Sequence, residues 1–212
     1  MSRYAGRIIR DAGDVAEGAE WLVALEPRFG EALALTGPLP LRRNEGGFPA
    51  LLDVIMGQQV SVASADAIWK RLEGAGLTRA ERVAVASEED LRACGLSRQK
   101  IRYAHALARA GLDFASLDQM PDDEVIARLT ALPGVGRWTA EIYAMFSLGR
   151  ADVFAPGDLA LQEAAKLLFD LPERPKDTVL RGMAVDWSPW RAVAARALWA
   201  YYRVAKSREG IK

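Results

Sequence analysis

Asp158 is the residue best placed to do chemistry in this chain. It follows Pro156 and Gly157 and opens the periodically apolar stretch LALQEAAKLLF, which is the position of a helix N-cap. A carboxylate held there accepts backbone N–H bonds, and these favour its ionised form. An aspartate stabilised as the anion is a weak base, so we expect an electrostatic role, in which it stabilises positive charge that develops nearby. The same features also describe a plain helix cap, and the two interpretations are compatible.

The stretch LPGVGRWTA, residues 132–140, separates two segments that both read as helix. Pro133 presets the entry to the turn, and Gly134 and Gly136 can take backbone angles that other residues avoid. A helix that begins near Gly136 leaves its first N–H groups unpaired and carries a partial positive charge, so a phosphate oxygen is a natural ligand there. Such a contact reads no base sequence. The alternative is a helix–turn–helix corner in which glycine serves only the geometry.

Asp158 and the hairpin residues must be positioned by helices. The sequence gives no sign of strands, because β-branched runs are short and period-2 alternation is nearly absent. We therefore predict an all-α protein. Helix starts are readable at Ser87, Ser97 and Pro121. The expected helices cover 14–35 with a break near Pro27, 48–58, 61–73, 87–94, 97–111, 121–131, 136–147, 158–169 and 188–206.

The composition excludes several kinds of site. Cys94 is the only cysteine and His105 the only histidine, which excludes intramolecular disulfides, zinc sites and four-cysteine iron–sulfur clusters. We expect His105 to be structural or solvent-facing. No run of about 18 apolar residues exists, and the N-terminus has no hydrophobic signal core. We expect no membrane partner and a cytoplasmic protein.

The charge is unevenly distributed although the formal net charge is zero. Residues 91–110 carry five basic residues and no acid, and residues 181–212 carry seven basic and two acidic residues, so each block is net +5. Residues 111–180 are net −6. A basic face for nucleic acid opposite an acidic back is one interpretation, and scattered solvated helix faces are the other.

Three stretches in this order carry a resemblance to a known family: LLDVIMGQQVSVASADAIWKRL, LTALPGVGRWTAEIYAMFSLGRADVFAPGDLALQEA and WSPWRAVAARALWAYY. They resemble the helix-hairpin-helix (HhH-GPD) DNA glycosylase superfamily, and most of all its DNA-3-methyladenine glycosylase II branch. The resemblance implies a two-lobed all-α fold, with residues 1–46 and 151–212 in one lobe, residues 47–150 in the other, and the active site in the cleft between them. It implies excision of alkylated purines, of the 3-methyladenine type, from duplex DNA by base flipping.

The resemblance assigns roles around the base. Asp158 would stabilise the cationic sugar and orient the attacking water, and Trp138, Ile142, Trp199 and Leu159 would line the base pocket. An indole face attracts a cationic ring by roughly 0.5–2 kcal/mol. Both tryptophans also fit core packing. Ile142 departs from the family, whose best-known members of this branch have tyrosine there, so the preferred base is open.

The resemblance also assigns contacts to DNA. Gln59 corresponds to the side chain that fills the gap left by the flipped base, and Gly134, Gly136 and Thr139 belong to the phosphate-binding hairpin. Many relatives have an apolar residue at position 59, so glutamine could instead hydrogen-bond the orphaned base. Alternatively, Gln58 and Gln59 are polar residues at a helix end that do not contact DNA.

The hairpin is further expected to bind a monovalent cation, Na⁺ or K⁺, through the backbone carbonyls of Thr130, Leu132 and Val135; no other cofactor is expected. Relatives that also cleave the strand have a nucleophilic lysine 20 residues before the aspartate, where this chain has Trp138. We therefore expect a monofunctional enzyme.

The expected partner of this protein is damaged double-stranded DNA at the bacterial nucleoid, and no obligate protein partner is evident. Two hypotheses compete with this one: an enzyme for deaminated or oxidised bases, and a non-catalytic DNA-binding module.

Overall fold

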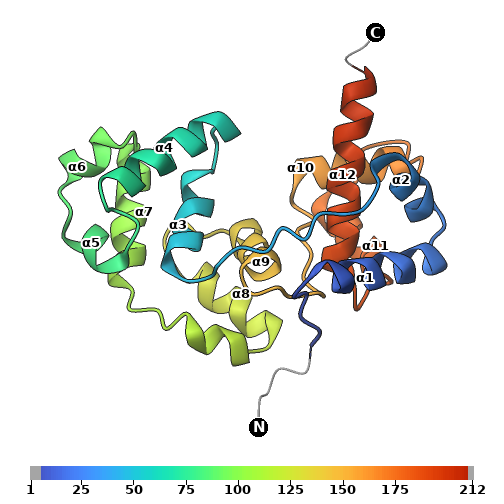
Figure 1. Ribbon diagram of the computed structural model, residues 1–212, viewed down its shortest axis with the longest axis horizontal. Helices are drawn as coiled ribbons and strands as arrows, with labels where there is room; N and C mark the ends of the chain where they lie inside the picture. The colour runs from blue at the N-terminus through green and yellow to red at the C-terminus, as the bar shows by residue number, and fades with distance from the viewer. Residues whose placement is uncertain (1–5, 210–212) are drawn as a thin grey trace. The chain divides into compact units, whose positions relative to one another are not determined.

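The computed structural model describes residues 6–209, and this part of the chain is helical (Figure 1). Its only β-pairing is an isolated bridge between Ile8 and Arg150. The expected all-α fold is thus confirmed. Residues 1–5, which belong to the first expected lobe, and residues 210–212, with Lys212, lie outside the described residues. None of the described helices is both long and apolar enough to cross a membrane.

The described chain divides into two compact units. One is Asn44–Leu148, here called the hairpin unit, and the other comprises residues 6–43 and 149–209, here called the aspartate unit. Residues 44–46 and 149–150 lie on the opposite side of the boundary from the one expected.

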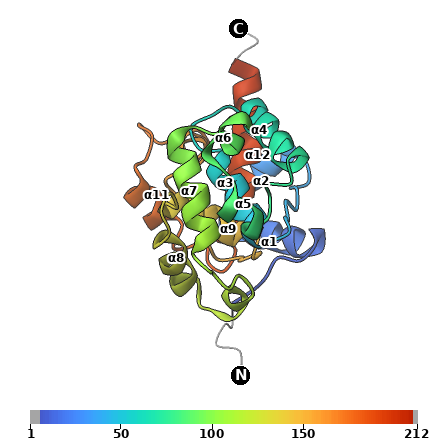
Figure 2. The ribbon, with the colours of Figure 1, turned by 90° about the vertical axis from the view of Figure 1, so that its left-hand side faces the viewer.

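The hairpin unit is built on α3, α7 and α9, which contact one another in pairs as α3 with α7 and α3 with α9. Figure 2 shows α7 in front, with α5 and α6 beside it. Leu51, Leu52, Ile55 and Met56 of α3 are fully buried in this core. The helices are α3 (Phe48–Met56), α4 (Val62–Gly74), α5 (Ala80–Val85), α6 (Glu88–Ala93), α7 (Arg98–Arg109), α8 (Asp122–Thr130) and α9 (Arg137–Phe146), with a 3₁₀ turn at Ala115–Gln119.

Serine caps fix several helix starts in this unit. The hydroxyls of Ser61, Ser87 and Ser97 each accept a backbone N–H three residues later. At Ser87 the side chain of Asp90 also accepts the N–H of Ser87, so the expected capping arrangement is a complete capping box. The sequence therefore located these starts correctly.

The aspartate unit packs α12 against α1, α2 and α10. Phe29, Phe154 and Phe169 surround Trp187, with ring centroids 5.4 to 5.8 Å from its own. Trp187 and Trp190 are both buried. The helices are α1 (Ala12–Leu25), α2 (Arg28–Thr36), α10 (Leu159–Leu168), α11 (Asp177–Met183) and α12 (Arg191–Glu209).

Three elements were not expected: α5, α11 and the 3₁₀ turn at 115–119. The last helix was expected at 188–206, but α12 spans Arg191–Glu209. The break near Pro27 is confirmed, because α1 ends at Leu25 and α2 begins at Arg28.

Candidate active site and nucleic-acid interface

The hairpin between α8 and α9 is a tight turn in which only one glycine is required by its backbone. Gly134 has φ 85°, and a Cβ atom there would fall on the ring of Tyr103. Gly136 has φ −78°, and a Cβ would meet nothing within 4 Å. The expectation that both glycines take angles that other residues avoid is therefore wrong for Gly136. Gly136 is exposed and faces open space at the start of α9.

The start of α9 has the features of an anion site. Gly136 is its N-cap, and within the described residues no side chain caps this end. The first N–H groups of a helix need partners, and the helix dipole favours negative charge there. A phosphate oxygen could supply both.

The carbonyl oxygens expected to hold a cation are available in the hairpin. The N–H of Val135 donates to the carbonyl of Leu132 at 3.1 Å, which closes the turn. Among the described residues, no hydrogen bond goes to the carbonyls of Thr130 and Val135. Rings of neutral carbonyl oxygens replace the hydration shell of monovalent cations in proteins. The donor set therefore fits Na⁺ or K⁺.

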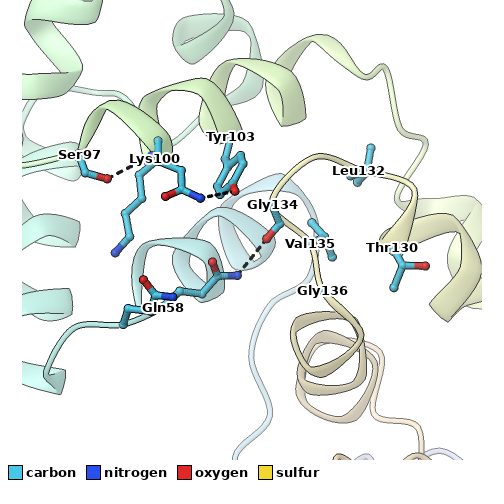
Figure 3. A pocket seen from close by; sticks show the side chains of 11 residues that line it. Gln58, Ser97, Lys100, Tyr103, Thr130, Leu132, Gly134, Val135 and Gly136 are labelled. Atoms are coloured by element: carbon cyan, nitrogen blue, oxygen red, sulfur yellow. Dashed lines mark hydrogen bonds between the residues drawn. The ribbon is translucent and has the colours of Figure 1, made fainter. Parts of the chain in front are cut away.

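Gln58 braces the hairpin from the turn between α3 and α4. Its Nε2 donates to the carbonyl of Gly134 at 3.0 Å (Figure 3). The same Nε2 donates to Oγ1 of Thr139 at 2.9 Å. Thr139 is 2% exposed, and its hydroxyl serves this hydrogen bond within the protein. Sequence reasoning missed this role of Gln58, because its partners are 76 and 81 residues away.

Gln59 occupies a strained and exposed position beside this brace. Its φ is 58°, in the left-handed region that costs a non-glycine residue about 1–2 kcal/mol. An exposed residue held in such a conformation motivates a functional hypothesis. Gln59 lines a cavity of about 390 Å³ with Gly134, Gly136, Trp138 and Thr139. Ile142 is not among the residues that line it.

A second cavity, of about 460 Å³, adjoins the first, and Lys100 and Tyr103 of α7 line it (Figure 3). Thr130, Leu132 and Val135 line it as well, together with Gln59. The hairpin unit therefore gathers Gln59 and the six expected hairpin residues around two adjoining cavities.

The Gln58 brace predicts a difference between two neighbouring glutamines. Gln58→Leu leaves the Gly134 carbonyl and the buried Thr139 hydroxyl without this donor, so we expect it to lower the free energy of unfolding by about 1–3 kcal/mol. Gln59→Leu is the matched control at an exposed position and should change it by less than about 0.5 kcal/mol. Urea denaturation of both variants measures this. Equal effects of the two substitutions would show that the brace contributes nothing.

In the aspartate unit, Asp158 caps α10 and also contacts a tryptophan. Its Oδ1 accepts the N–H groups of Ala160 at 2.9 Å and Leu161 at 3.1 Å. The indole Nε1 of Trp199, on α12, donates to the same oxygen at 3.2 Å. Gln162 fixes the preceding turn by donating to the carbonyl of Pro156 at 2.8 Å. The carboxylate is therefore held by three N–H donors on a rigid scaffold.

The expected pocket residues are at least partly accessible. Trp138, Ile142 and Trp199 are each half-buried, and Leu159 is 61% exposed. His105 is half-buried as well, and its Nε2 lies 3.1 Å from the carbonyl of Ala86, which agrees with its expected structural role.

Comparisons with known proteins agree in both sequence and fold. Residues 52–189 match the model of the HhH-GPD superfamily of base excision DNA repair proteins. The structure of a DNA-3-methyladenine glycosidase from Bacillus halodurans is 34% identical and superposes with a TM-score of 0.79, over 90% of this chain and 91% of that one.

Two further relatives extend the comparison. The Schizosaccharomyces pombe 3-methyladenine DNA glycosylase Mag1, solved in complex with abasic DNA, is 27% identical with a TM-score of 0.77, over 86% of this chain and 95% of that one. DNA-3-methyladenine glycosylase 2 of Escherichia coli is 28% identical over 68% of this chain and 54% of its own length. The family match covers more than half of the chain and contains the hairpin and Asp158. This chain belongs to the HhH-GPD superfamily of base excision DNA repair proteins.

Proposed function

We propose that this protein is a monofunctional DNA glycosylase that removes alkylated purines, of the 3-methyladenine type, from double-stranded DNA in base excision repair. The observation that carries the proposal is the Asp158 carboxylate, held by two backbone N–H groups and the Trp199 indole in a chain of this superfamily. The names of its relatives support the substrate class.

Asp158 acts on the sugar. When the N-glycosidic bond breaks, its electron pair leaves with the base and positive charge develops on the deoxyribose. A fixed carboxylate stabilises that charge without having to reorganise, and it orients the water whose oxygen bonds to the sugar. The products are the free base and an abasic site.

A cationic base needs little help from an acid, because its positive ring makes it a good leaving group. We propose that Trp138 and Trp199 stack on this ring through their indole faces, and that Ile142 and Leu159 supply apolar contacts. With isoleucine at position 142, the pocket has fewer aromatic side chains than those of the best-known relatives.

The hairpin holds the DNA by its backbone. A phosphate binds the N–H groups at the start of α9, and a monovalent cation on the carbonyls of Thr130, Leu132 and Val135 adds positive charge beside it. Gln59 enters the space vacated when the nucleotide leaves the stack. Because genomic DNA is the substrate, we expect the enzyme to act in the cytoplasm, at the nucleoid.

The enzyme forms no covalent bond with the sugar. Trp138 occupies the position where strand-cleaving relatives have a nucleophilic lysine, so no Schiff base forms there. The strand should break only after treatment with alkali.

A panel of duplexes, each with one defined lesion, tests the proposal. We expect the protein to release 3-methyladenine or 7-methylguanine as the free base, detected by mass spectrometry, and to leave an intact strand until alkali is added. Preferential release of hypoxanthine, uracil or 8-oxoguanine would reassign the enzyme to deaminated or oxidised bases. Binding without release of any base would make it a DNA-binding module.

Trp138 should favour cationic bases over neutral ones. We expect Trp138→Leu to slow the release of 7-methylguanine by about 2- to 30-fold, the range that corresponds to a cation–π interaction of 0.5–2 kcal/mol, and to affect neutral hypoxanthine less. Trp69→Leu is the control, since Trp69 is also half-buried in the hairpin unit, where its Nε1 donates to Glu73. Single-turnover rates on both lesions measure the ratio. An equal loss of rate on 7-methylguanine and hypoxanthine would show that Trp138 does not recognise the positive charge of the base.

A further inference from the structure

Three functional side chains share one face of α12. Arg196, Trp199 and Arg203 are spaced by three and then four residues, which places them along the same side of a helix. Trp199 donates to Asp158. Arg203 therefore lies about one helical turn, about 6 Å along the axis, beyond the tryptophan that contacts the proposed catalytic carboxylate.

Arg196 anchors a second segment against this face. It is 1% exposed, and its Nε and Nη2 donate to the carbonyl of Leu41 at 3.1 and 3.0 Å, while Nη1 donates to the carbonyl of Ala192 at 2.8 Å. We call this pair of hydrogen bonds from one guanidinium group to the Leu41 carbonyl the Arg196 fork. It fixes residues 37–43 where they cross α12 (Figure 1). Arg42, which follows Leu41 in the chain, is exposed and has a backbone φ of 47°.

The left-handed backbone of Arg42 costs about 1–2 kcal/mol, and glycine would avoid that cost. The fold nevertheless retains a charged side chain at this position. Such strain, held in place by the buried fork of Arg196, is typical of residues positioned for a ligand.

Positive charge accumulates around the fork of Arg196. Burial, followed by the charges of Arg42 and Arg43, lowers the pKa of Arg196 to about 10. Partial burial and then the charge of Arg203 lower the pKa of Arg42. Within the described residues, no carboxylate pairs with Arg42 or Arg203. The two exposed guanidinium groups therefore repel each other, and an anion bound between them would relieve this repulsion.

We propose that Arg42 and Arg203 form a binding site for a phosphodiester of the DNA strand that carries the extruded nucleotide. The inference rests on the proposed function. Guanidinium groups bind phosphate oxygens in a bidentate manner, and two of them can hold one phosphate from two sides. The neighbourhood of Trp199 and Asp158 places this phosphate close to the reacting sugar. The aspartate unit thus has a backbone contact of its own, separate from the hairpin.

The salt dependence of DNA binding tests this site. We would measure the affinity for a duplex with a tetrahydrofuran abasic analogue, by fluorescence anisotropy over a salt series, for wild type, Arg42→Ala, Arg203→Ala and the double variant. Each lost phosphate contact reduces the slope of log K against log [salt] by about 0.9. We expect a reduction of this size and a loss of affinity of about 10-fold at low salt, with the double variant close to the single ones because they share one phosphate.

Two matched variants separate charge from structure. Arg10→Ala removes one exposed positive charge from the same unit and should leave the slope unchanged. Arg42→Lys and Arg203→Lys should keep the slope while losing part of the affinity, since lysine retains the charge but not the bidentate geometry.

Neutral methylphosphonate linkages locate the phosphate. One such linkage is placed in turn at each position that flanks the abasic analogue. At one of these positions it should lower the affinity of wild type for the duplex. At that same position it should cause no further loss of affinity in the Arg42→Ala, Arg203→Ala double variant. An unchanged salt slope in the variants, or losses of affinity that add at every linkage position, would overturn the site. Release of methylated base by wild type in the same samples would leave the proposed function intact. A wild type that neither binds the duplex nor releases base would instead overturn the proposed function.

Discussion

Asp158→Asn should slow base release by about 100- to 1000-fold, because it removes a preorganised charge worth roughly 3–4 kcal/mol in the transition state. Asparagine has nearly the same shape and is as good an N-cap as aspartate, so α10 keeps its start and the fold remains intact. Binding to an abasic duplex should be nearly unchanged. Single-turnover kinetics with 7-methylguanine, at saturating protein, measure the effect on the chemical step alone.

Asp11→Asn is the control for this substitution. Asp11 is also an aspartate N-cap in the aspartate unit, since its Oδ1 accepts the N–H of Asp14 at the start of α1, and it is exposed. We expect its rate to stay within about 2-fold of wild type, since exposed substitutions away from a site have small effects. If Asp158→Asn lost no more than Asp11→Asn, the carboxylate of Asp158 would be a helix cap only.

Gly134→Ala should lower the free energy of unfolding by about 2–5 kcal/mol. The left-handed φ of 85° costs about 1–2 kcal/mol for a residue with a Cβ, and overpacking against the Tyr103 ring adds about 1–3 kcal/mol. Any relaxation must move the turn that presents α9, so binding to an abasic duplex should weaken as well. Urea denaturation and anisotropy measure the two effects.

Gly136→Ala is the matched control, because a Cβ there meets open space and φ is −78°. It should cost less than about 1 kcal/mol, the scale of a changed N-cap. The double variant Tyr103→Ala with Gly134→Ala should lose less stability than the sum of the single variants, because Tyr103→Ala removes the ring that the new Cβ atom at position 134 would otherwise overlap. Simple additivity of the two losses would contradict the observed packing of Tyr103 on the turn.

Local signals in the sequence account for much of the fold. The serine caps at 61, 87 and 97 and the proline before α2 mark helix boundaries through interactions that span only a few residues. The helices α5 and α11 lack such signals and have only six and seven residues. That is too short to show apolar periodicity, so tertiary packing stabilises them and the sequence pattern does not predict them.

Some features of the site also have a local sequence signal, and others depend on contacts between distant residues. The Pro-Gly-Asp sequence and the following apolar helix predict the capping role of Asp158, and the structure confirms it. The Gln58 brace, the packing of Gly134 on Tyr103 and the Arg196 fork could not be predicted, because they join residues between 31 and 155 positions apart. These contacts depend on tertiary structure, which no local pattern encodes.

The central claim is that Asp158 stabilises positive charge on the sugar, and cationic analogues of that sugar test it most directly. We would compare affinities for two otherwise identical duplexes, one with a pyrrolidine abasic analogue, which is protonated, and one with neutral tetrahydrofuran. Transition-state analogues bind at least about 100-fold more tightly than ground-state ligands. We expect a preference of this order for pyrrolidine in wild type and its loss in Asp158→Asn. Equal affinity of wild type for both duplexes, or an unchanged preference in the variant, would contradict it.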